Sequence, residues 1–394
     1  MNRLQELYRQ PRKRCSVAED QHYYPGLEGV VAGETRLSYI DGEAGELVIG
    51  GYPLAKLAGN ATYEETLFLL YEDRLPDADE LEAFRDDLAG RRTVDGAVLD
   101  VLREAAETDC DAMEALRMGA ATADIGGHGD DRETAKRMVA VLPTVVAAYH
   151  RFAEGEAFVE PRADLRHTAN YLYMLTGEEP DEAAVRGVET YLNTVIDHGF
   201  NASTFTARTI VSTESDIVSA VTGAVGALKG PLHGGAPGPV LDMLLDIDAS
   251  GDVEEWLRER LESGERLMGF GHRVYRARDP RAAVLSTAAR EFFDASDDGQ
   301  AFFETVQLVE DTAVSLLEEY EPDRALETNV EFYTATLLYG AGVPRGLFSA
   351  TFGVARVGGW TAHALEQLED NRLIRPRSRY VGERRREWTP VDVR

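Results

Sequence analysis

Hydrophobic residues recur at the three- and four-residue spacing of an α-helix along most of this chain. In the segment 63–71 this spacing follows Asn60-Ala61-Thr62, which offers a candidate N-cap, and early acids follow the cap. The same pattern predicts helices over 80–88, 96–107, 132–152, 162–175, 181–196, 215–228 and 301–319. Strand-like alternation is confined to 29–51, where 37–42 predicts a short strand that enters a turn. We therefore predict an all-α protein with one small β element.

The composition places few limits on this picture but excludes some functions. The chain has 394 residues, of which 44% are hydrophobic, so it can bury a large core and can contain two domains. No stretch approaches the roughly 18 to 20 uninterrupted apolar residues that cross a bilayer. The first residues, Met1 to Glu6, lack the apolar run of a signal peptide. We expect a cytoplasmic protein without a membrane partner.

The charge of the chain is strongly negative, with a formal net value of −29. A surface dominated by carboxylates repels nucleic acids and anionic membranes, so neither is an expected partner. The acids are spread along the sequence, which is typical of a solvated acidic shell. We interpret this as adaptation to a high-salt cytoplasm, where ions screen charges within about 3 Å at 1 M. An anionic ligand must then find a locally positive pocket.

The two cysteines, Cys15 and Cys110, have neither metal-ligand spacing nor a C-x-x-C redox pattern, and we predict ordinary thiols. The histidines are dispersed, and no regularly spaced carboxylate cluster accompanies them. The sequence also lacks a nicotinamide-type Gly-x-Gly-x-x-Gly motif after a strand. No metal site and no bound cofactor are therefore expected.

Two short segments each place a single histidine among glycines. They are Gly-Pro-Leu-His-Gly-Gly at 230–235, with His233, and Gly-Phe-Gly-His-Arg-Val-Tyr at 269–275, with His272. Glycine lets the backbone approach a ligand closely, so these histidines are candidates for polarising a small bound carbonyl. The segments are followed by Asn-Val-Glu-Phe-Tyr at 329–333 and accompanied by arginines 273, 276, 278 and 281. This combination indicates an active site for an anionic substrate.

These motifs resemble those of the citrate synthase family. The supporting blocks are Ser-Tyr-Ile-Asp-Gly at 38–42, Asp-His-Gly-Phe-Asn-Ala-Ser-Thr at 197–204, the two histidine segments, Asp-Pro-Arg at 279–281 and Phe-Gly-Val-Ala-Arg at 352–356. The resemblance extends from Gly26 to Ser378. It implies a citrate synthase-like fold, in which a large helical domain contains an inserted smaller helical domain.

The resemblance also implies how the chain is divided and assembled. An N-terminal extension would occupy 1–25, the large domain 26–234 and 343–394, and the small domain 235–342. The small domain would close over the substrates and exclude water from an unstable intermediate. The family forms homodimers, and its C-terminal segment often reaches across the dimer.

The family reaction joins acetyl-CoA to oxaloacetate and then hydrolyses the thioester of citryl-CoA. A thioester methyl group is a very weak acid, so it needs a base held against it and a donor that stabilises the enolate. By resemblance, Glu331 takes the methyl proton and His233 donates to the thioester oxygen. His272 polarises the ketone of oxaloacetate, and His198 is a further oxaloacetate ligand.

Oxaloacetate carries two carboxylates, for which the planar fork of arginine offers bidentate hydrogen bonds. The resembling positions are Arg281, Arg356 and Arg375, the last expected from the neighbouring subunit. Arg276 lies where the family often places a basic residue against the phosphates of coenzyme A. Coenzyme A would enter as part of the substrate, acetyl-CoA, and not as a cofactor.

Three positions depart from the family pattern. Glu331 stands in place of the usual aspartate, and a displacement of about 1 Å in such a geometry can cost about a hundredfold in rate. Val195 replaces the first histidine of His-x-Asp-His, which predicts altered hydrogen bonding behind the site. Pro237 replaces an asparagine, which removes a backbone donor and fixes φ.

Three functions therefore stay open from the sequence. Citrate formation from acetyl-CoA is the first, and 2-methylcitrate formation from propionyl-CoA uses the same acid, base and arginines. One methylene in the acyl pocket separates them, which binding can discriminate by about 1 to 3 kcal/mol. A third possibility, suggested by Glu331, is a silent relative that binds coenzyme A or a dicarboxylate and acts through dimerisation.

Overall fold

The computed structural model describes residues 23–124, 127, 129–234, 237–271, 275, 278–295, 299–322 and 326–394. The chain divides into two compact units. One unit is Thr35–Ile374, and the other joins the two ends of the chain, Met1–Glu34 and Arg375–Arg394. Within the described part of the second unit lie two short 3-10 helices, η1 (Pro25–Leu27) and η3 (Val391–Val393), and the guanidinium of Arg379 lies over the ring of Tyr23.

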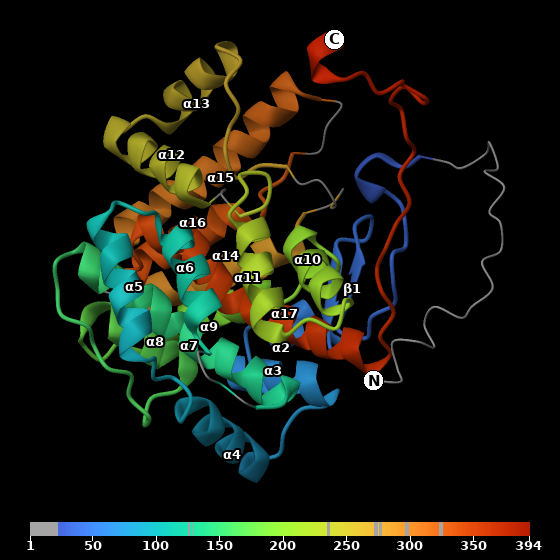
Figure 1. Cartoon of the computed structure of the whole chain (residues 1–394). Coiled ribbons are helices and arrows are strands. Elements are labelled where there is room, and N and C mark those ends of the chain that lie inside the picture. The colour runs from blue at the N-terminus through green and yellow to red at the C-terminus, as the bar shows by residue number, and fades with distance from the viewer. Residues whose placement is uncertain are drawn as a thin grey trace. The chain divides into compact units, whose positions relative to one another are not determined.

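The first unit is built almost wholly from helices (Figure 1). Its helices are α2 (Leu54–Leu57), α3 (Tyr63–Glu72), α4 (Ala78–Ala89), α5 (Gly96–Glu107), α6 (Ala112–Thr122), α7 (Asp131–Ala153), α8 (His167–Thr176), α9 (Glu182–Val195), α10 (Ala202–Val211), α11 (Ile217–Leu228), α12 (Pro237–Ser250), α13 (Val253–Glu262), α14 (Pro280–Ala295), α15 (Gln300–Tyr320), α16 (Val330–Gly340) and α17 (Phe348–Glu369). A 3-10 turn, η2 (Arg345–Leu347), precedes α17.

The sheet found among the described residues is three-stranded and antiparallel. Its strands are β1 (Ser38–Asp41), β2 (Glu46–Ile49) and β3 (Tyr52–Pro53), and Ser38 pairs with Ile49. The prediction of an all-α protein with one small β element is confirmed. The predicted strand over 37–42 corresponds to β1.

Most of the predicted helices begin and end within two residues of the observed ones, but the helix predicted from residue 162 is a clear exception. It begins at His167, and ahead of it the backbone N–H of Arg162 donates to the side chain of Asn170 (2.8 Å). Helix α6 was not predicted, although Asp111 and Glu114 form a capping box at its start. Helices α10, α12, α13, α14, α16 and α17 were also not predicted, and several contain or follow glycines.

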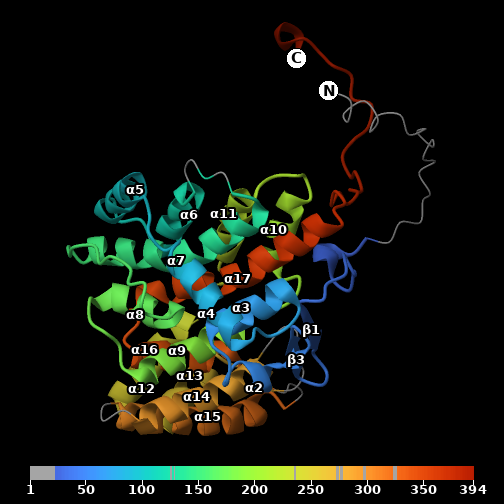
Figure 2. The same cartoon turned by 90° about the horizontal axis from the view of Figure 1, so that it is seen from below.

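Helix α17 lies in the middle of the first unit, where it packs against α7, α9, α10 and α11 (Figures 1 and 2). Most of its residues are buried, including the charged Arg356 and the aromatic Trp360. A helix that is buried on nearly every side has no solvated face, so the polar side chains that it carries must find partners inside the protein. These partners define the site described below.

Helices α12, α13 and α15 pack on one another and lie together in both views (Figures 1 and 2). They fall within the range 235–342 that the sequence analysis assigns to a small domain. That division stays a prediction. None of the helices in the described part of the chain is long and apolar enough to cross a membrane.

Candidate active site

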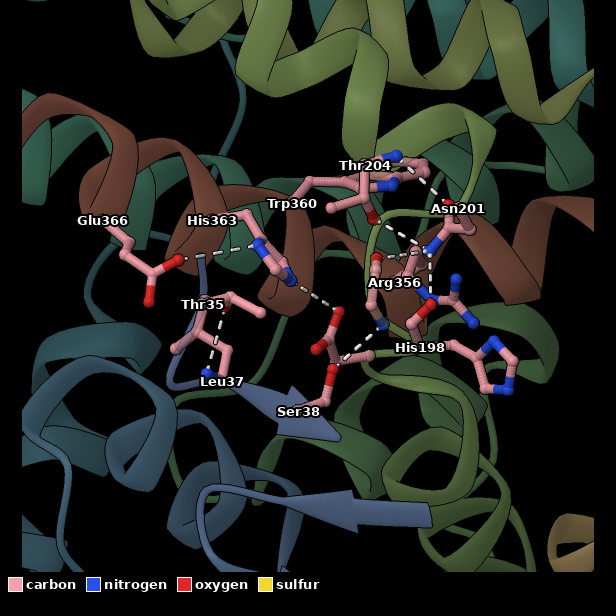
Figure 3. A network of polar contacts seen from close by, with 12 residues as sticks. Thr35, Leu37, Ser38, His198, Asn201, Thr204, Arg356, Trp360, His363 and Glu366 are labelled. Atoms are coloured by element: carbon pink, nitrogen blue, oxygen red, sulfur yellow. Dashed lines mark hydrogen bonds and ion pairs between the residues drawn. The ribbon is translucent and has the colours of Figure 1, made fainter. Parts of the chain in front are cut away.

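Three residues of α17 reach the segment that connects α9 with α10 (Figure 3). They are spaced at i, i+4 and i+7, so they share one face of the helix. The Nε of Arg356 donates to the carbonyl oxygen of Val195, and the indole nitrogen of Trp360 donates to the Ser203 hydroxyl (2.9 Å). The imidazole Nε2 of His363 contacts Oδ1 of Asp197 (3.0 Å). One helix face therefore fixes this segment at three points.

The close approach of this segment to α17 depends on a glycine. A Cβ placed on Gly359 would lie 2.2 Å from the carbonyl oxygen of Ile196 and 3.1 Å from Oδ1 of Asp197. The first contact is with backbone, which has little freedom to move away. The absence of a side chain at Gly359 thus permits the two segments to touch.

His198 lies in the same segment, and it is buried. Its Nε2 is 3.0 Å from the hydroxyl oxygen of Tyr275, and the two rings pack edge to face. The next residue, Gly199, has a φ of 55°, and its backbone N–H donates to the Ser38 hydroxyl on β1 (2.9 Å). Asn201 then caps α10 by accepting from the backbone N–H of Thr204. The predicted ligand His198 is therefore held by contacts with β1, with Tyr275 and with the start of α10.

His233 follows α11, and its ring contacts the first turn of α10. Its Nε2 lies 2.8 Å from the Ser203 hydroxyl and accepts the backbone N–H of Ser203 (3.3 Å). Because a backbone N–H can only donate, the proton of the neutral ring belongs on Nδ1. Burial and the positive charge of Arg356 lower the pKa of His233 to about 4. At neutral pH, His233 is thus a neutral imidazole with Nδ1–H as its remaining donor.

Glu331 occupies the first turn of α16, two residues after the cap residue Asn329. The Asn329 side chain accepts the backbone N–H of Glu331 (3.0 Å) and donates to the carbonyl oxygen of Gly271 (3.0 Å). The backbone N–H of Asn329 also donates to Gly269 (2.9 Å), so the segment before α16 pairs with the segment that precedes His272. Burial raises the pKa of the Glu331 carboxyl, and the charge of Arg281 opposes this only in part. A raised pKa makes this carboxylate a stronger base.

Arg281 and Arg356 are both buried, but their surroundings differ. Arg281 forms a two-point ion pair with Asp279, with Nη2 2.8 Å from Oδ2 and Nε 3.1 Å from Oδ1. For Arg356, no carboxylate lies within ion-pair distance among the residues that the structure describes. Burial lowers the pKa of Arg356 to about 10, so it remains a cation at neutral pH. A buried cation without a carboxylate partner favours an anionic ligand.

Several of these groups influence the pKa of the same neighbours. Burial raises the pKa of Tyr191, and Arg356, Glu331, Tyr171 and Arg281 also act on its hydroxyl. The charge of Arg356 also acts on His233. The structure thus brings together predicted site residues from helices α14, α16 and α17 and from the loop after α11.

Other predicted site residues are not placed in this cluster. His272 and Arg276 lie outside the described residues. Arg375 is exposed and belongs to the unit formed by the chain ends, whereas the other described site residues belong to Thr35–Ile374. The roles of these three residues stay predictions.

The structure explains why glycine and proline occur in and near the two histidine segments. Gly269 and Gly271 have positive φ values of 88° and 76°, which side chains rarely adopt. A Cβ on Gly234 would lie 2.4 Å from the carbonyl oxygen of Leu228. Pro237 is the first residue of α12, where a missing N–H costs no helical hydrogen bond. The departure at this position is therefore compatible with the fold.

Several residues of the cluster were not predicted as functional. Ser203 and Tyr275 lie inside the motifs at 197–204 and 269–275, and their position in these motifs could have indicated a role in the site. Trp360 and His363 follow Arg356 at helical spacing, which could have placed them on its face had α17 been predicted. Nothing in the sequence around Tyr191 indicated that it belongs to the site. Among the described residues, no group of three or more His, Cys, Asp or Glu could hold a metal ion.

The fold and the cluster define a helical protein with a site that combines a neutral histidine donor, a half-buried carboxylate of raised pKa and buried arginines. The model of the citrate synthase C-terminal domain family matches residues 26–377 of this chain. The chain belongs to the citrate synthase family.

Named relatives and a solved structure agree with this assignment. The chain is 47% identical to the citrate synthase of Haloferax volcanii over 94% of its own length and 98% of that protein. It is 38% identical to the 2-methylcitrate synthase of Mycobacterium tuberculosis, over 94% of this chain and 93% of that protein. A ternary complex of the Thermoplasma acidophilum citrate synthase with carboxymethyl coenzyme A and oxaloacetate is similar at 29% identity, with a TM-score of 0.85, over 95% of this chain and 100% of that chain.

Proposed function

We propose that this protein condenses acetyl-CoA with oxaloacetate and hydrolyses the resulting thioester, giving citrate and coenzyme A. The observation that carries the proposal is a site that contains a neutral His233, the half-buried Glu331 with its raised pKa, and the buried Arg356, which has no carboxylate within ion-pair distance among the described residues. The first two are the donor and the base that enolate formation requires. The third provides positive charge for a small anion inside an acidic protein.

In the first step, Glu331 takes a proton from the methyl group of acetyl-CoA. Nδ1–H of His233 donates a hydrogen bond to the thioester oxygen, on which negative charge develops. Ser203 keeps the other ring nitrogen as an acceptor, so the donor stays on the substrate side. The enolate carbon then attacks the ketone carbon of oxaloacetate, and the resulting alkoxide takes up a proton.

We propose that Arg281 and Arg356 bind the carboxylates of oxaloacetate, with His198 as a further donor. His272 would polarise the ketone, and Arg276 would contact the phosphates of coenzyme A. Water finally attacks the thioester of citryl-CoA and releases citrate and free coenzyme A. We further propose that residues 235–342 form the small domain that closes over these substrates, in keeping with the mutual packing of α12, α13 and α15. A cytoplasmic location also stays a prediction.

Release of free thiol from acetyl-CoA or propionyl-CoA, with oxaloacetate in molar KCl, tests the reaction. We expect faster turnover with acetyl-CoA, lost in Glu331→Gln and kept in Glu318→Gln, which changes an exposed acid on α15. Glu331→Asp tests whether the longer side chain is matched to this backbone, and we expect it to lower kcat by about tenfold or more. Faster turnover with propionyl-CoA would instead make this a 2-methylcitrate synthase. Silence of the folded wild-type protein with both donors would favour a non-catalytic binding role.

We propose a homodimer in which Arg375 acts in the site of the partner subunit. Its exposure within the segment 375–394 leaves it available for such a contact. The test mixes two inactive variants, Glu331→Gln and Arg375→Leu, under conditions that exchange subunits. A shared site should restore about a quarter of the wild-type activity, because half of the dimers then contain one intact site. No recovery, despite exchange, would place Arg375 outside the partner's site.

A further inference from the structure

A chain of buried polar side chains runs from α17 to the segment that carries His198 (Figure 3). We call it the α17 polar chain, and its members are Glu366, Arg208, His363 and Asp197. Nη1 of Arg208 donates both to a Glu366 oxygen and to Nδ1 of His363, the latter at 3.0 Å. Nε2 of His363 contacts Oδ1 of Asp197 at 3.0 Å. None of these contacts is used by the proposed reaction.

The partners of His363 fix its tautomer. An arginine nitrogen can only donate, so Nδ1 of His363 accepts the hydrogen bond from Arg208. The ring hydrogen is therefore on Nε2, and His363 donates it to Asp197. The ring also packs edge to face on Phe200, which limits its rotation. His363 is thus an oriented neutral donor aimed at one carboxylate.

Asp197 depends strongly on this donor. It is fully buried, and within the described residues its second oxygen, Oδ2, has no hydrogen-bond partner. Burial alone would raise the pKa of Asp197, but the contact with His363, a hydrogen bond with the Ser38 side chain and the charge of Arg356 outweigh it and hold the pKa below its usual value. Loss of the His363 donor would therefore both free the side chain and favour its protonated form.

The position of Asp197 matters because its neighbours bind substrate in the proposed function. His198 follows it directly, and Arg356 is tied to the same segment through the carbonyl oxygen of Val195. The two reacting groups have anchors other than Asp197, since His233 rests on Ser203, which Trp360 holds, and Glu331 rests on Asn329. A disturbance at Asp197 should thus affect the binding of oxaloacetate more than the chemical step.

We propose that His363 is a positioning residue, which holds the Asp197 carboxylate and thereby places His198 and Arg356 for oxaloacetate. The proposal rests on the proposed function. Val195 occupies the position where the family pattern has a histidine, and in this protein the imidazole that contacts Asp197 comes from α17. Affinity for oxaloacetate is the property that this contact should control.

The test compares His363→Phe, which removes both hydrogen bonds, with His363→Gln, whose amide can donate to Asp197 and accept from Arg208. Thr361→Val is the matched control, because it removes a buried hydrogen bond from the same helix to Tyr71 (2.8 Å), away from the site. In His363→Phe we expect the KM for oxaloacetate to rise by about tenfold or more, with kcat changed by less than about threefold. Its KM should also become dependent on pH, because loss of the His363 donor raises the pKa of the buried Asp197, while the wild-type value stays flat. His363→Gln and Thr361→Val should behave like the wild type.

The proposal is overturned if His363→Phe leaves the KM for oxaloacetate unchanged. It is also overturned if kcat and the KM for acetyl-CoA change by as large a factor as the KM for oxaloacetate. If His363→Phe does not fold, Arg208→Met provides the second variant, since it removes the donor that fixes the tautomer. It should raise the same KM and introduce the same pH dependence, and wild-type behaviour would equally overturn the proposal. Calorimetric titration with oxaloacetate tests the role of His363 separately from the proposed function. It measures the role of His363 even if the wild-type protein turns over neither acyl-CoA, a result that contradicts the proposed function alone.

Discussion

Two histidines of this protein have their protons placed by partners that can only donate. The backbone N–H of Ser203 makes Nε2 of His233 an acceptor, and the guanidinium of Arg208 makes Nδ1 of His363 an acceptor. The remaining hydrogen of His233 is thus available for the thioester oxygen of the proposed reaction, and that of His363 is directed to Asp197. At the scale of the residue, the site uses hydrogen-bond geometry to fix which atom donates.

The pKa of His233 offers a direct test of this arrangement. Burial and the charge of Arg356 lower it to about 4, so removal of that charge should move it upward toward the ordinary value of about 6.5. We expect this shift in Arg356→Met, measured by NMR titration of histidine-labelled protein. Arg278→Met changes an exposed arginine outside this cluster and should leave the pKa of His233 in place. An unchanged pKa in Arg356→Met would contradict the assigned cause.

At the scale of the element, α17 acts as the frame of the site. Its residues 356, 360 and 363 contact the segment between α9 and α10, and Gly359 lets that segment lie against the helix backbone. A second frame is formed by α15. One carboxylate on α15, that of Glu310, accepts hydrogen bonds from Arg278, Thr328 and Tyr333. It thereby ties together the segments that lead into α14 and α16.

Gly359→Ala tests the contact with α17. The added Cβ would overlap the carbonyl oxygen of Ile196, so we expect a loss of about 1 to 3 kcal/mol in stability and a higher KM for oxaloacetate. Chemical denaturation and steady-state kinetics measure the two effects. Gly96→Ala at the start of α5, where a Cβ meets nothing within 4 Å, should change stability by less than about 0.5 kcal/mol. Equal behaviour of the two variants would show that the segment can move aside.

Glu310→Gln tests the second frame. All three partners donate to the carboxylate, and a neutral amide would lose the ion pair with Arg278 and require a hydroxyl that faces its NH2 group to change from donor to acceptor. We expect kcat to fall by about tenfold, with a smaller change in the KM for oxaloacetate. The reason is that Glu331 lies only a few residues after Thr328, so a shift of this segment would move the proposed base. Glu318→Gln on the same helix changes an exposed acid and serves as the control. A change confined to KM would contradict the separation of roles between α15 and α17.

At the scale of the whole molecule, the formal net charge of −29 is the dominant feature. Many of the described ion pairs lie at the surface, where each contributes little, so they do not offset the repulsion. Mobile ions reduce the Debye length to about 3 Å at 1 M salt. We therefore expect the Tm to rise clearly between low-salt buffer and molar KCl, measured by calorimetry. A Tm independent of KCl would contradict adaptation to high salt.

The interior also contains a buried acid, Glu189, whose ionisation affects stability. Glu189 on α9 is fully buried, and burial together with the charge of Glu64 raises its pKa to about 7, although Arg166 and Arg186 oppose the shift. The unfolded chain releases this proton near pH 4.5. Between these two values the folded state binds more protons, so stability falls as the pH rises from about 4.5 to 7.

Glu189→Gln removes this dependence because an amide does not ionise. Relative to the wild type, the variant should gain stability between about pH 5 and pH 8, by at most about 3 kcal/mol. Denaturant titrations at both pH values, in molar KCl, measure the difference. Glu182→Gln changes an exposed acid on the same helix and should show no such trend. A pH-independent difference between Glu189→Gln and the wild type would contradict the raised pKa.

The sequence by itself determined the helical class, most boundaries of α3, α5, α7, α9, α11 and α15, and the motifs that contain His198, His233, Glu331 and Arg356. These features depend on the spacing of residues that are neighbours in the chain, which is visible in the sequence. Helices rich in glycine, such as α17, were missed because glycine predicts turns until packing requires a close approach.

Only the tertiary structure decided which of these residues meet and which partners they have. Asp197, Arg208 and His363 come from separate elements, and so do His233 and Ser203. Their contacts arise from the packing of helices that are far apart in sequence, and the positions of hydrogens and the pKa shifts follow from those contacts. A local pattern cannot specify such long-range neighbours, so the composition of the motifs was readable from the chain, whereas the electrostatics of the site depended on the fold.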